Sequence, residues 1–292
     1  MKESLNIQII TGKCNHCLLC VRDCVSGAWR NVNSEPIMVA PELCSRCGHC
    51  VAVCPRLAIY HEALDYGQVT KINTDLLNPD GYRQIVQERR SIRQYKTTAV
   101  PHDLIENILK MASHSPTASN KQNVAYTVIT DKPTLKYLSE SVFGFGKSLY
   151  EKSRKGIGKI FYFILKTFSP DNVSRYLDPM GYYIEETAKG RDYILHNAPA
   201  LILVRGPKTE SFINENCNIA AANIMNYAHT CGLGTCYIGF LTLALKFSPA
   251  LRKKAGIPED QKVYAALILG YPAYTHSYTT SRKQPDIRWI DF

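Results

Sequence analysis

The chain has 292 residues, of which 45% are hydrophobic and 21% charged, and its formal net charge is +10. This length allows one full-sized core and a small accessory domain. The longest apolar run, IFYFIL at 160–165, is too short to cross a bilayer, and the opening MKESLNIQIITGK has only short apolar pieces, so we expect neither a membrane span nor a secretory signal. We therefore expect a cytoplasmic protein whose eleven cysteines are thiols or metal ligands and do not form disulfides.

Two cysteine sets with identical spacing open the chain. They are CNHCLLCVRDC at 14–24 and CSRCGHCVAVC at 44–54. The spacing C-x2-C-x2-C-x3-C puts three thiolates on one tight loop, where they can bind three irons of a [4Fe–4S] cube, and leaves the fourth cysteine to come from elsewhere. Structural zinc sites instead separate two C-x2-C pairs by a long loop. The sequence therefore predicts two [4Fe–4S] clusters.

The fourth cysteine of each set is expected to serve the other cluster, as in two-cluster ferredoxins. The two predicted ligand sets are Cys14, Cys17, Cys20 and Cys54 for one cluster, and Cys44, Cys47, Cys50 and Cys24 for the other. About residues 5–64 resemble the bacterial two-[4Fe–4S] ferredoxin domain, including the apolar segments IQII before the first set and LAIYHE after the second. The family usually has proline after both fourth cysteines; Pro55 matches this pattern and Val25 departs from it. If each cluster site carries about −2, the net charge of the loaded chain falls to about +6.

A polar segment with Asn-Pro and Asp-Gly turn signals follows, and we expect a linker there at 65–84. Beyond it, helical and extended patterns alternate, which is typical of an α+β or α/β domain. The expected elements are a helix at 104–112, strands at 124–130 and 199–206, a long helix at 218–231, and a strand at 263–272.

The long helix has a face of small and apolar residues, and Gly232 follows it as a C-cap. The face consists of Ala220, Ala221, Ile224, Met225, Ala228 and Cys231. Such a face needs a close partner, either within the chain or across a dimer.

The stretch ERRSIRQYK at 88–96 offers guanidinium groups and a hydroxyl that suit a phosphate-bearing cofactor, with a solvated basic face as the alternative. Further stretches follow in the order SPTASNKQ at 115–122, GLGTCYIG at 232–239, and LGYP at 269–272 with SRKQP at 281–285. With these pieces in this order, residues 85–292 resemble the nitroreductase family of FMN-dependent oxidoreductases.

The resemblance implies an α+β fold with a small ferredoxin-like iron–sulfur domain at 1–64, the linker, and an FMN-binding nitroreductase-like domain at 85–292, assembled as a domain-intertwined homodimer. It also implies flavin contacts, which we carry over by position. Arg89, Arg90, Ser91 and Arg93 correspond to contacts with the phosphate, ribityl chain and ring edge; Arg282 to a second phosphate contact; Pro116, Thr117 and Asn120 to a loop that reaches the flavin from the opposite subunit; and Ile238 and Gly239 to backbone beside the flavin N5 edge. This sequence departs from the family at Asn123 and Val124, and at Lys283 and Gln284, which lengthen the spacing after Arg282. No signal identifies a catalytic residue.

Iron–sulfur clusters exchange single electrons, whereas a flavin can deliver a pair. We therefore expect an oxidoreductase that is supplied by a one-electron donor such as reduced ferredoxin or flavodoxin. The resemblance implies a small planar acceptor, either a nitroaromatic or a quinone. Reduction of activated alkenes or halogenated compounds stays open, as does an electron-transfer module that serves a partner protein. The net charge does not indicate nucleic-acid binding, because interleaved aromatic and basic motifs are absent from the sequence.

Several other residues have simple structural interpretations. Cys217, Cys231 and Cys236 are expected to be small buried apolar residues. His49 is expected on the surface, and Tyr182 and Tyr183 in packing. The stretch 151–168 predicts a basic amphipathic helix, either a lid or a dimer helix, with an acidic partner protein as the second choice and a membrane surface as the less favoured one.

Overall fold

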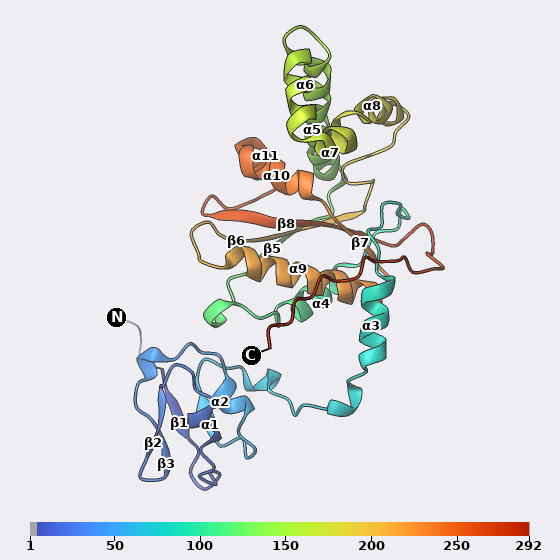
Figure 1. Cartoon of the computed structure of the whole chain (residues 1–292). Helices are drawn as coiled ribbons and strands as arrows, with labels where there is room; N and C mark the ends of the chain where they lie inside the picture. Colours follow the sequence, from blue (N-terminus) through green and yellow to red (C-terminus); the bar gives the residue numbers. More distant parts are fainter. Residues whose placement is uncertain (1–4, 292) are drawn as a thin grey trace. The chain divides into compact units, whose positions relative to one another are not determined.

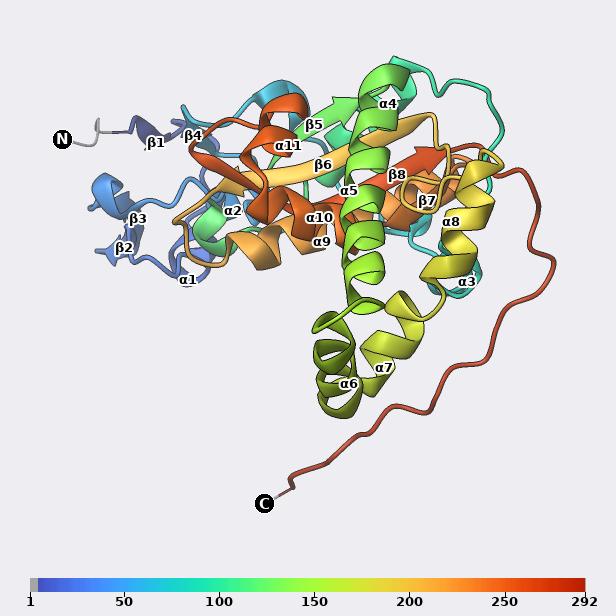
Figure 2. The same cartoon turned by 90° about the horizontal axis from the view of Figure 1, so that it is seen from above.

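The computed structural model describes residues 5–291 (Figures 1 and 2), so the first four residues of the predicted ferredoxin domain lie outside the described part. The chain divides into two compact units. The first contains the chain up to Asn78 together with Thr117–Gln122, and the second contains Pro79–Pro116 and the chain from Asn123 onward. Within residues 5–291, none of the helices has both the length and the apolar character needed to cross a membrane.

The first unit is built from two similar halves. Its elements are β1 (Ile7–Ile9), α1 (Leu19–Arg22), β2 (Trp29–Val32), β3 (Glu35–Met38), α2 (His49–Ala52) and β4 (Ile59–His61). Strand β1 pairs with β4, and β2 pairs with β3, both antiparallel. The apolar segments that flank the cysteine sets thus form one two-stranded sheet, and their side chains Ile7 and Ile59 join Trp29 and Val51 in a small core. This core holds the two cysteine loops in place.

The segment between the cysteine sets and the arginine-rich stretch ERRSIRQYK at 88–96, called the basic motif below, contains a helix that the sequence did not predict. Helix α3 (Pro79–Glu88) begins inside the expected 65–84 linker. Proline fits the first turn of a helix, where its missing N–H has no helical acceptor to lose. Tyr82, Ile85 and Val86 recur at helical spacing, but no residue of this helix is buried, and the Asn-Pro and Asp-Gly dipeptides at its start are turn signals that favoured a linker.

The second unit is an antiparallel sheet with helices on both faces, which confirms the expected α+β class. The strands are β5 (Ala125–Ile129), β6 (Ala200–Pro207), β7 (Gly234–Tyr237) and β8 (Gln261–Gly270), in the order β5-β6-β8-β7. The central strands β6 and β8 are apolar on both faces, because helices cover both of them.

Alternate residues of β6 enter two different cores, which are formed with the helices that lie on the two sides of the sheet (Figure 1). Leu201 and Leu203 face α5 (Lys132–Ser153), α10 (Gly239–Phe247) and α11 (Pro249–Lys254). Ile202 and Val204 face α4 (His102–Ala112) and α9 (Ile213–Thr230) on the other side. The period of two along a strand produces this division.

The long helix α9 starts five residues earlier than predicted, and Gly232 follows it with a left-handed φ of 73°. Its small residues Ala220, Ala221, Ile224 and Ala228 are buried against β6, β8 and α4 of the same chain. Of the two alternatives that the sequence left open for this face, the structure shows the partner within the chain.

The basic stretch 151–168 is not one helix. Helix α5 ends at Ser153, and α6 (Gly158–Phe168) starts after a turn. Gly156 is left-handed in this turn with a φ of 47°, and the backbone of Gly158 approaches the Lys152 carbonyl so closely that no side chain fits. These two glycines thus replace the predicted continuous helix with a hairpin. It is followed by α7 (Pro170–Asn172), a π-helical turn at Val173–Leu177, and α8 (Met180–Ala188).

Candidate functional site

The two cysteine loops share an unusual backbone geometry. His16 and Arg46 both have a φ of 56°, and Leu18 and Gly48, at the next equivalent positions, have φ values of 58° and 75°. Left-handed residues turn a chain sharply and are uncommon outside glycine. Their repetition at matching positions means that each C-x2-C-x2-C run is curled in the same way before its short helix begins.

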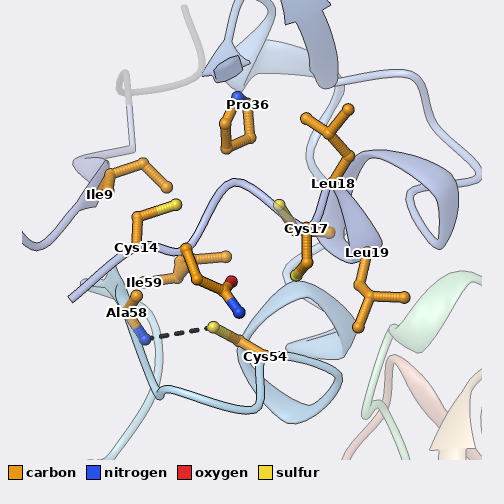
Figure 3. A pocket seen from close by; sticks show the side chains of 11 residues that line it. Ile9, Cys14, Cys17, Leu18, Leu19, Pro36, Cys54, Ala58 and Ile59 are labelled. Atoms are coloured by element: carbon orange, nitrogen blue, oxygen red, sulfur yellow. Dashed lines mark hydrogen bonds between the residues drawn. The ribbon is translucent and has the colours of Figure 1, made fainter. Parts of the chain in front are cut away.

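The curled loops bring the eight cysteines into two groups of four. Cys14, Cys17, Cys20 and Cys54 line one cavity, and Cys24, Cys44, Cys47 and Cys50 line a second. Figure 3 shows the first cavity, where Cys14 and Cys17 come from one loop and Cys54 from the other. These groups are the two ligand sets expected from the ferredoxin spacing.

Among the described residues, no three or more histidine, cysteine or carboxylate side chains lie close enough together to hold a single metal ion. The volume free of protein atoms, part of it open to solvent, is about 280 Å³ in the first cavity and about 310 Å³ in the second. Four thiolates that bind one zinc ion would all lie about 2.3 Å from its centre. The donor set of four cysteines in each group fits an iron–sulfur cluster.

The first cavity is mostly apolar. Besides cysteines it is lined by Ile9, Asn15, Leu18, Leu19, Pro36, Ala58 and Ile59. The backbone N–H of Ala58 donates to Cys54 Sγ at 3.3 Å (Figure 3), and that of His16 donates to Cys14 Sγ at 3.4 Å. Burial raises the pKa of the Cys20 thiol, and a bound iron centre would act in the opposite direction by stabilising the thiolate.

The second cavity has polar side chains in its wall. Ser26 Oγ lies 3.4 Å from Cys24 Sγ, and His61 Nε2 lies 3.5 Å from Cys44 Sγ. Trp29 also lines the cavity, and its buried Nε1 has no hydrogen-bond partner among the described residues.

The cysteine thiols of the second cavity titrate differently from one another. Burial raises the pKa of Cys50 to about 11, with the Trp29 side chain acting in the opposite direction. Burial also acts to raise the pKa of Cys24, but hydrogen bonds from Ser26 and the backbone outweigh it and lower the value. The N–H and O–H groups in this wall thus favour thiolate sulfur.

His61 is a site residue that the sequence analysis missed. It is fully buried, and its Nδ1 accepts the N–H of Ala63 at 3.2 Å. A nitrogen that accepts carries no proton, so the proton of the neutral ring is on Nε2, which points to Cys44 Sγ. Burial lowers the pKa of His61, which agrees with a neutral ring. No motif marks this histidine; it reaches the cavity only because β4 pairs with β1.

His49 lies on the surface, as expected, with its Nδ1 3.4 Å from Asp23 Oδ2. Tyr183 packs on Tyr193 with ring centroids 4.5 Å apart, and Tyr182 adjoins both, so these aromatics form a packing cluster. Cys217 and Cys236 are buried and Cys231 is partly buried, again as expected.

In the second unit, the basic motif lies along strand β7. The N–H of Ile92 donates to the Thr235 carbonyl at 3.0 Å, and Ser91 forms a parallel β-bridge with Thr235. Gly234 makes this approach possible, because a Cβ there would lie 2.5 Å from Ile92 Cγ1. Two stretches that are far apart in the sequence, RRSIR and GLGTCYIG, are therefore joined at one place.

Positive charge and unused donors gather at this junction. Burial raises the pKa of Cys236, while the guanidinium groups of Arg93 and Arg89 and the Ser91 hydroxyl act against that rise, so all four residues are close. Arg90 Nη1 donates to the carbonyls of Gln87 and Arg89, at 2.7 and 2.9 Å. Its Nη2 is buried without a partner in the described chain, as is the hydroxyl of Thr235. An anion with several acceptor oxygens would satisfy these groups.

Ile238 and Gly239 lie where β7 ends and α10 begins. The Ile238 N–H donates to the Ala266 carbonyl at 2.8 Å, which fixes the turn. Gly239 is exposed, and a Cβ on it would meet nothing within 4 Å. The first backbone N–H groups of α10 have no acceptor within the helix. This turn therefore places such N–H groups at the end of β7, the strand along which the basic motif lies.

The remaining predicted flavin residues lie elsewhere in the single chain. Pro116 is exposed, and Thr117–Gln122 belongs to the first unit, where Asn120 Nδ2 donates to the Arg46 carbonyl at 2.9 Å. Arg282 is exposed in the irregular C-terminal segment, and its Nη1 donates to Thr280 Oγ1 at 3.2 Å. The chain by itself assembles Arg89, Arg90, Ser91 and Arg93 with the strand that leads into the Ile238–Gly239 turn.

Comparison with known proteins agrees with this geometry. Residues 86–271, well over half of the chain, match the nitroreductase family. The chain belongs to the nitroreductase family. Residues 13–59 match the 4Fe-4S dicluster domain, which confirms the fusion expected from the motifs and an oxidoreductase carrying an iron–sulfur module.

The similar proteins cover about two thirds to three quarters of this chain. A protein of Archaeoglobus fulgidus with the provisional name NADH dehydrogenase/NAD(P)H nitroreductase is 26% identical over 189 residues, 65% of this chain and 84% of that one. The iodotyrosine deiodinase of Haliscomenobacter hydrossis is 24% identical over 200 residues, 66% of this chain and 79% of that one. The FMN-bound nitroreductase of Bacteroides fragilis superimposes with a TM-score of 0.54 at 21% identity, over 74% of this chain and 100% of that one, which shows a shared fold.

Proposed function

We propose that this chain is an iron–sulfur flavoprotein that takes electrons from a one-electron donor and reduces a small planar acceptor, using two [4Fe–4S] clusters and FMN. When bound, the clusters exchange single electrons and the flavin one or two, which turns a one-electron supply into a two-electron reduction. The observation that carries the proposal is the gathering of eight cysteines into two groups of four in a chain of the nitroreductase family.

In this proposal the eight cysteines are the cluster ligands, four to each cavity. Anaerobic preparation should then yield about eight irons and eight sulfides per chain, as two four-iron clusters require. Cys17→Ser should remove one cluster and destabilise the other, because each cavity is lined by cysteines from both loops. Stoichiometric zinc without the broad visible absorption of iron–sulfur clusters would contradict the assignment.

We assign the FMN phosphate to Arg89, Arg90 and Ser91, with Arg93 nearer the ribityl chain and ring. The unpartnered Nη2 of Arg90 supports this, as does the FMN bound by the Bacteroides fragilis neighbour. Arg89→Ala should weaken FMN binding by about 1.5–3 kcal/mol, the usual size of a hydrogen bond to a charged group, which is roughly a tenfold to 150-fold rise in Kd.

Arg83→Ala is the matched control for Arg89, because Arg83 is exposed on α3, where it forms an ion pair with the likewise exposed Asp80. It should leave the FMN affinity unchanged in a fluorescence titration. Equal affinities for the Arg89 variant and the parent would contradict the phosphate assignment.

The proposed assembly is a homodimer in which Pro116, Thr117 and Asn120 reach the flavin of the opposite subunit and Arg282 adds a second phosphate contact. Apolar side chains left exposed in the single chain support an oligomer. On α10 these include Phe240, Leu243 and Phe247, and near the C-terminus Trp289 and Ile290. Exposed apolar groups in such numbers usually mark an interface. A flavin-replete monomer in light-scattering measurements would contradict the dimer.

The proposed donor is reduced ferredoxin or flavodoxin, because clusters are superfluous when a nicotinamide reduces the flavin directly. The name of the Archaeoglobus relative makes NAD(P)H the competing donor. The test is anaerobic turnover with reduced ferredoxin, NADH or NADPH, for the parent and for Cys17→Ser reloaded with FMN. Ferredoxin-driven activity should collapse in the variant. If nicotinamide drives both proteins equally and ferredoxin drives neither, the clusters are not the entry route.

The proposed acceptor is a nitroaromatic or a quinone. A second candidate is reductive dehalogenation, which the likeness to iodotyrosine deiodinase favours. Turnover of 4-nitrobenzoate, a benzoquinone and 3-iodotyrosine under one donor separates these acceptors. Absence of turnover with all of them, in a protein whose flavin is still reduced, would favour the electron-transfer module that serves a partner protein.

A further inference from the structure

The two cysteine cavities are related by an internal repeat but have different walls. Each cysteine of the first half has a counterpart 30 residues later, from Cys14 and Cys44 onward. By the same spacing, Trp29 corresponds to Ile59, and His61 corresponds to Asn31. His61 lines the second cavity, whereas Asn31 is exposed and lines neither. The halves therefore differ in the side chains that face the sulfurs.

The difference is one of hydrogen-bond donors. Both cavities have backbone donors: the N–H groups of His16 and Arg46 each lie 3.4 Å from a cysteine sulfur, the Ala58 N–H donates to Cys54 in the first cavity, and backbone N–H groups of residues 26–29 act on Cys24 in the second. The second cavity adds His61 Nε2 at 3.5 Å from Cys44 Sγ and the buried indole N–H of Trp29. The first cavity has Ile59 where the second has Trp29. Asn15 is the first cavity's polar wall residue besides cysteine, and its counterpart Ser45 lines the second.

Buried donors next to sulfur act on the reduction potential of an iron–sulfur cluster. Reduction adds negative charge to the cluster and its thiolates, and an N–H aimed at sulfur stabilises the more negative state. Water does the same, and Cys47 of the second cavity is exposed while its counterpart Cys17 is partly buried. Both differences raise the potential of the second site relative to the first.

Nearby formal charges do not reverse this order. Each loop carries an exposed arginine: Arg22 donates to the Cys17 carbonyl at 2.9 Å, and Arg46 follows Cys44. Exposed charges are screened by water and salt, whereas His61 and Trp29 are 0% and 3% exposed and act through a less polar medium. The buried donors therefore decide the difference.

We propose that His61 and Trp29 make the two clusters unequal, so that the one held by Cys24, Cys44, Cys47 and Cys50 has the higher reduction potential and is the downstream member of the pair. This inference rests on the proposed function, since it requires both clusters. His61 acts through the sulfur of Cys44 and Trp29 through the cavity wall, so both are positioning residues rather than ligands.

The experiment is an anaerobic potentiometric titration of the FMN-loaded full chain, followed by electron paramagnetic resonance. Iron and sulfide are counted first in the parent and in each variant. His61→Leu removes the donor at similar volume, Trp29→Phe removes the indole N–H together with the five-membered ring that carries it, and His61→Gln keeps an N–H donor. Asn31→Leu is the matched control at the equivalent position of the first half.

The parent should show two couples. His61→Leu and Trp29→Phe should each lower the reduction potential of the higher couple. At a fixed applied potential, the ratio of reduced to oxidised cluster should fall about tenfold, which corresponds to a shift of about 59 mV for a one-electron couple. His61→Gln should recover most of the loss, and Asn31→Leu should move neither couple.

The outcomes separate this inference from the function on which it rests. A parent without eight irons would remove the proposed function itself. A parent with both clusters but coincident potentials, or variants that shift the lower couple or neither, would overturn the inference and leave the function standing. If His61→Leu fails to hold its clusters, Trp29→Phe and His61→Gln still decide.

Discussion

Gly234 should be one of the least replaceable residues of the flavin domain, because it is the point at which the basic motif approaches the sheet. A Cβ at this position would lie 2.5 Å from Cγ1, 2.7 Å from Cβ and 2.9 Å from Cγ2 of Ile92. Ile92 is itself buried and tied to Thr235 by a backbone hydrogen bond of 3.0 Å. The side chain cannot move aside without displacing Ser91 and Arg93, so Gly234→Ala must strain the junction.

The size of the effect follows from the kind of contact. Forcing one methyl group into a packed core costs about 1–3 kcal/mol. For a domain of this size, each kcal/mol lowers Tm by about 2–4 °C, so we expect a fall of roughly 2–12 °C. Affinity for FMN should fall as well, since the displaced segment carries the proposed phosphate contacts.

The assay is thermal unfolding together with an FMN titration, and Gly144→Ala is the control. Gly144 lies within α5, and a methyl group added there would meet nothing within 4 Å, so alanine should stabilise the helix by about 1 kcal/mol. Ile92→Ala combined with Gly234→Ala should be less harmful than the sum of the single changes, because the two side chains compete for one space. If Gly234→Ala raises Tm as Gly144→Ala does, the reasoning about this junction is refuted.

Three further predictions concern single residues. Burial lowers the pKa of His196, which also faces Asp192, Arg93 and Arg191, so the unfolded chain binds a proton at a pH where the folded chain does not. The free energy of unfolding should therefore fall as the pH drops below about 6.5, by at most about 1.4 kcal/mol per pH unit from this group. In urea titrations at several pH values, His196→Gln should reduce this dependence of the unfolding free energy on pH. Burial raises the pKa of Cys217 to about 12, so iodoacetamide should label the partly buried Cys231 before Cys217 in the folded protein, and equal labelling of these two residues by peptide mass spectrometry would contradict this. Arg205 donates to Thr127 Oγ1 at 2.8 Å, to the Tyr126 carbonyl at 3.2 Å and to Gln261 Oε1, so Arg205→Met should cost about 1.5–3 kcal/mol in urea unfolding while Arg83→Met costs almost nothing.

Features that depend on short-range spacing could be predicted from the sequence. The spacing of the cysteine sets determined which four sulfurs meet, because a [4Fe–4S] cluster needs three ligands on one tight loop and a fourth from outside it. The apolar strands β6 and β8 were recognisable for the same local reason: strands covered on both faces must be apolar throughout.

Features that depend on tertiary contacts could not be predicted from the sequence. Nothing around His61 in the sequence shows that β4 pairs with β1 and turns this ring toward Cys44. The small-residue face of α9 predicted close packing but could not tell a partner in the same chain from one in a dimer. The break between α5 and α6 was accessible in principle, since Gly156 and Gly158 interrupt the apolar pattern where α5 ends.

The loop at Thr117–Gln122 shows that the iron–sulfur unit is not a module that ends at a linker. This loop lies in the sequence between α4 and β5, yet it belongs to the first compact unit. Asn120 binds the carbonyl of Arg46, two residues after Cys44. The loop that we expect to reach a flavin is thus hydrogen-bonded to the cysteine loop of the second cavity, whose wall contains His61 and Trp29. The cluster that we propose as the downstream member of the pair is therefore the one whose cysteine loop contacts the proposed flavin loop, through the Arg46 carbonyl.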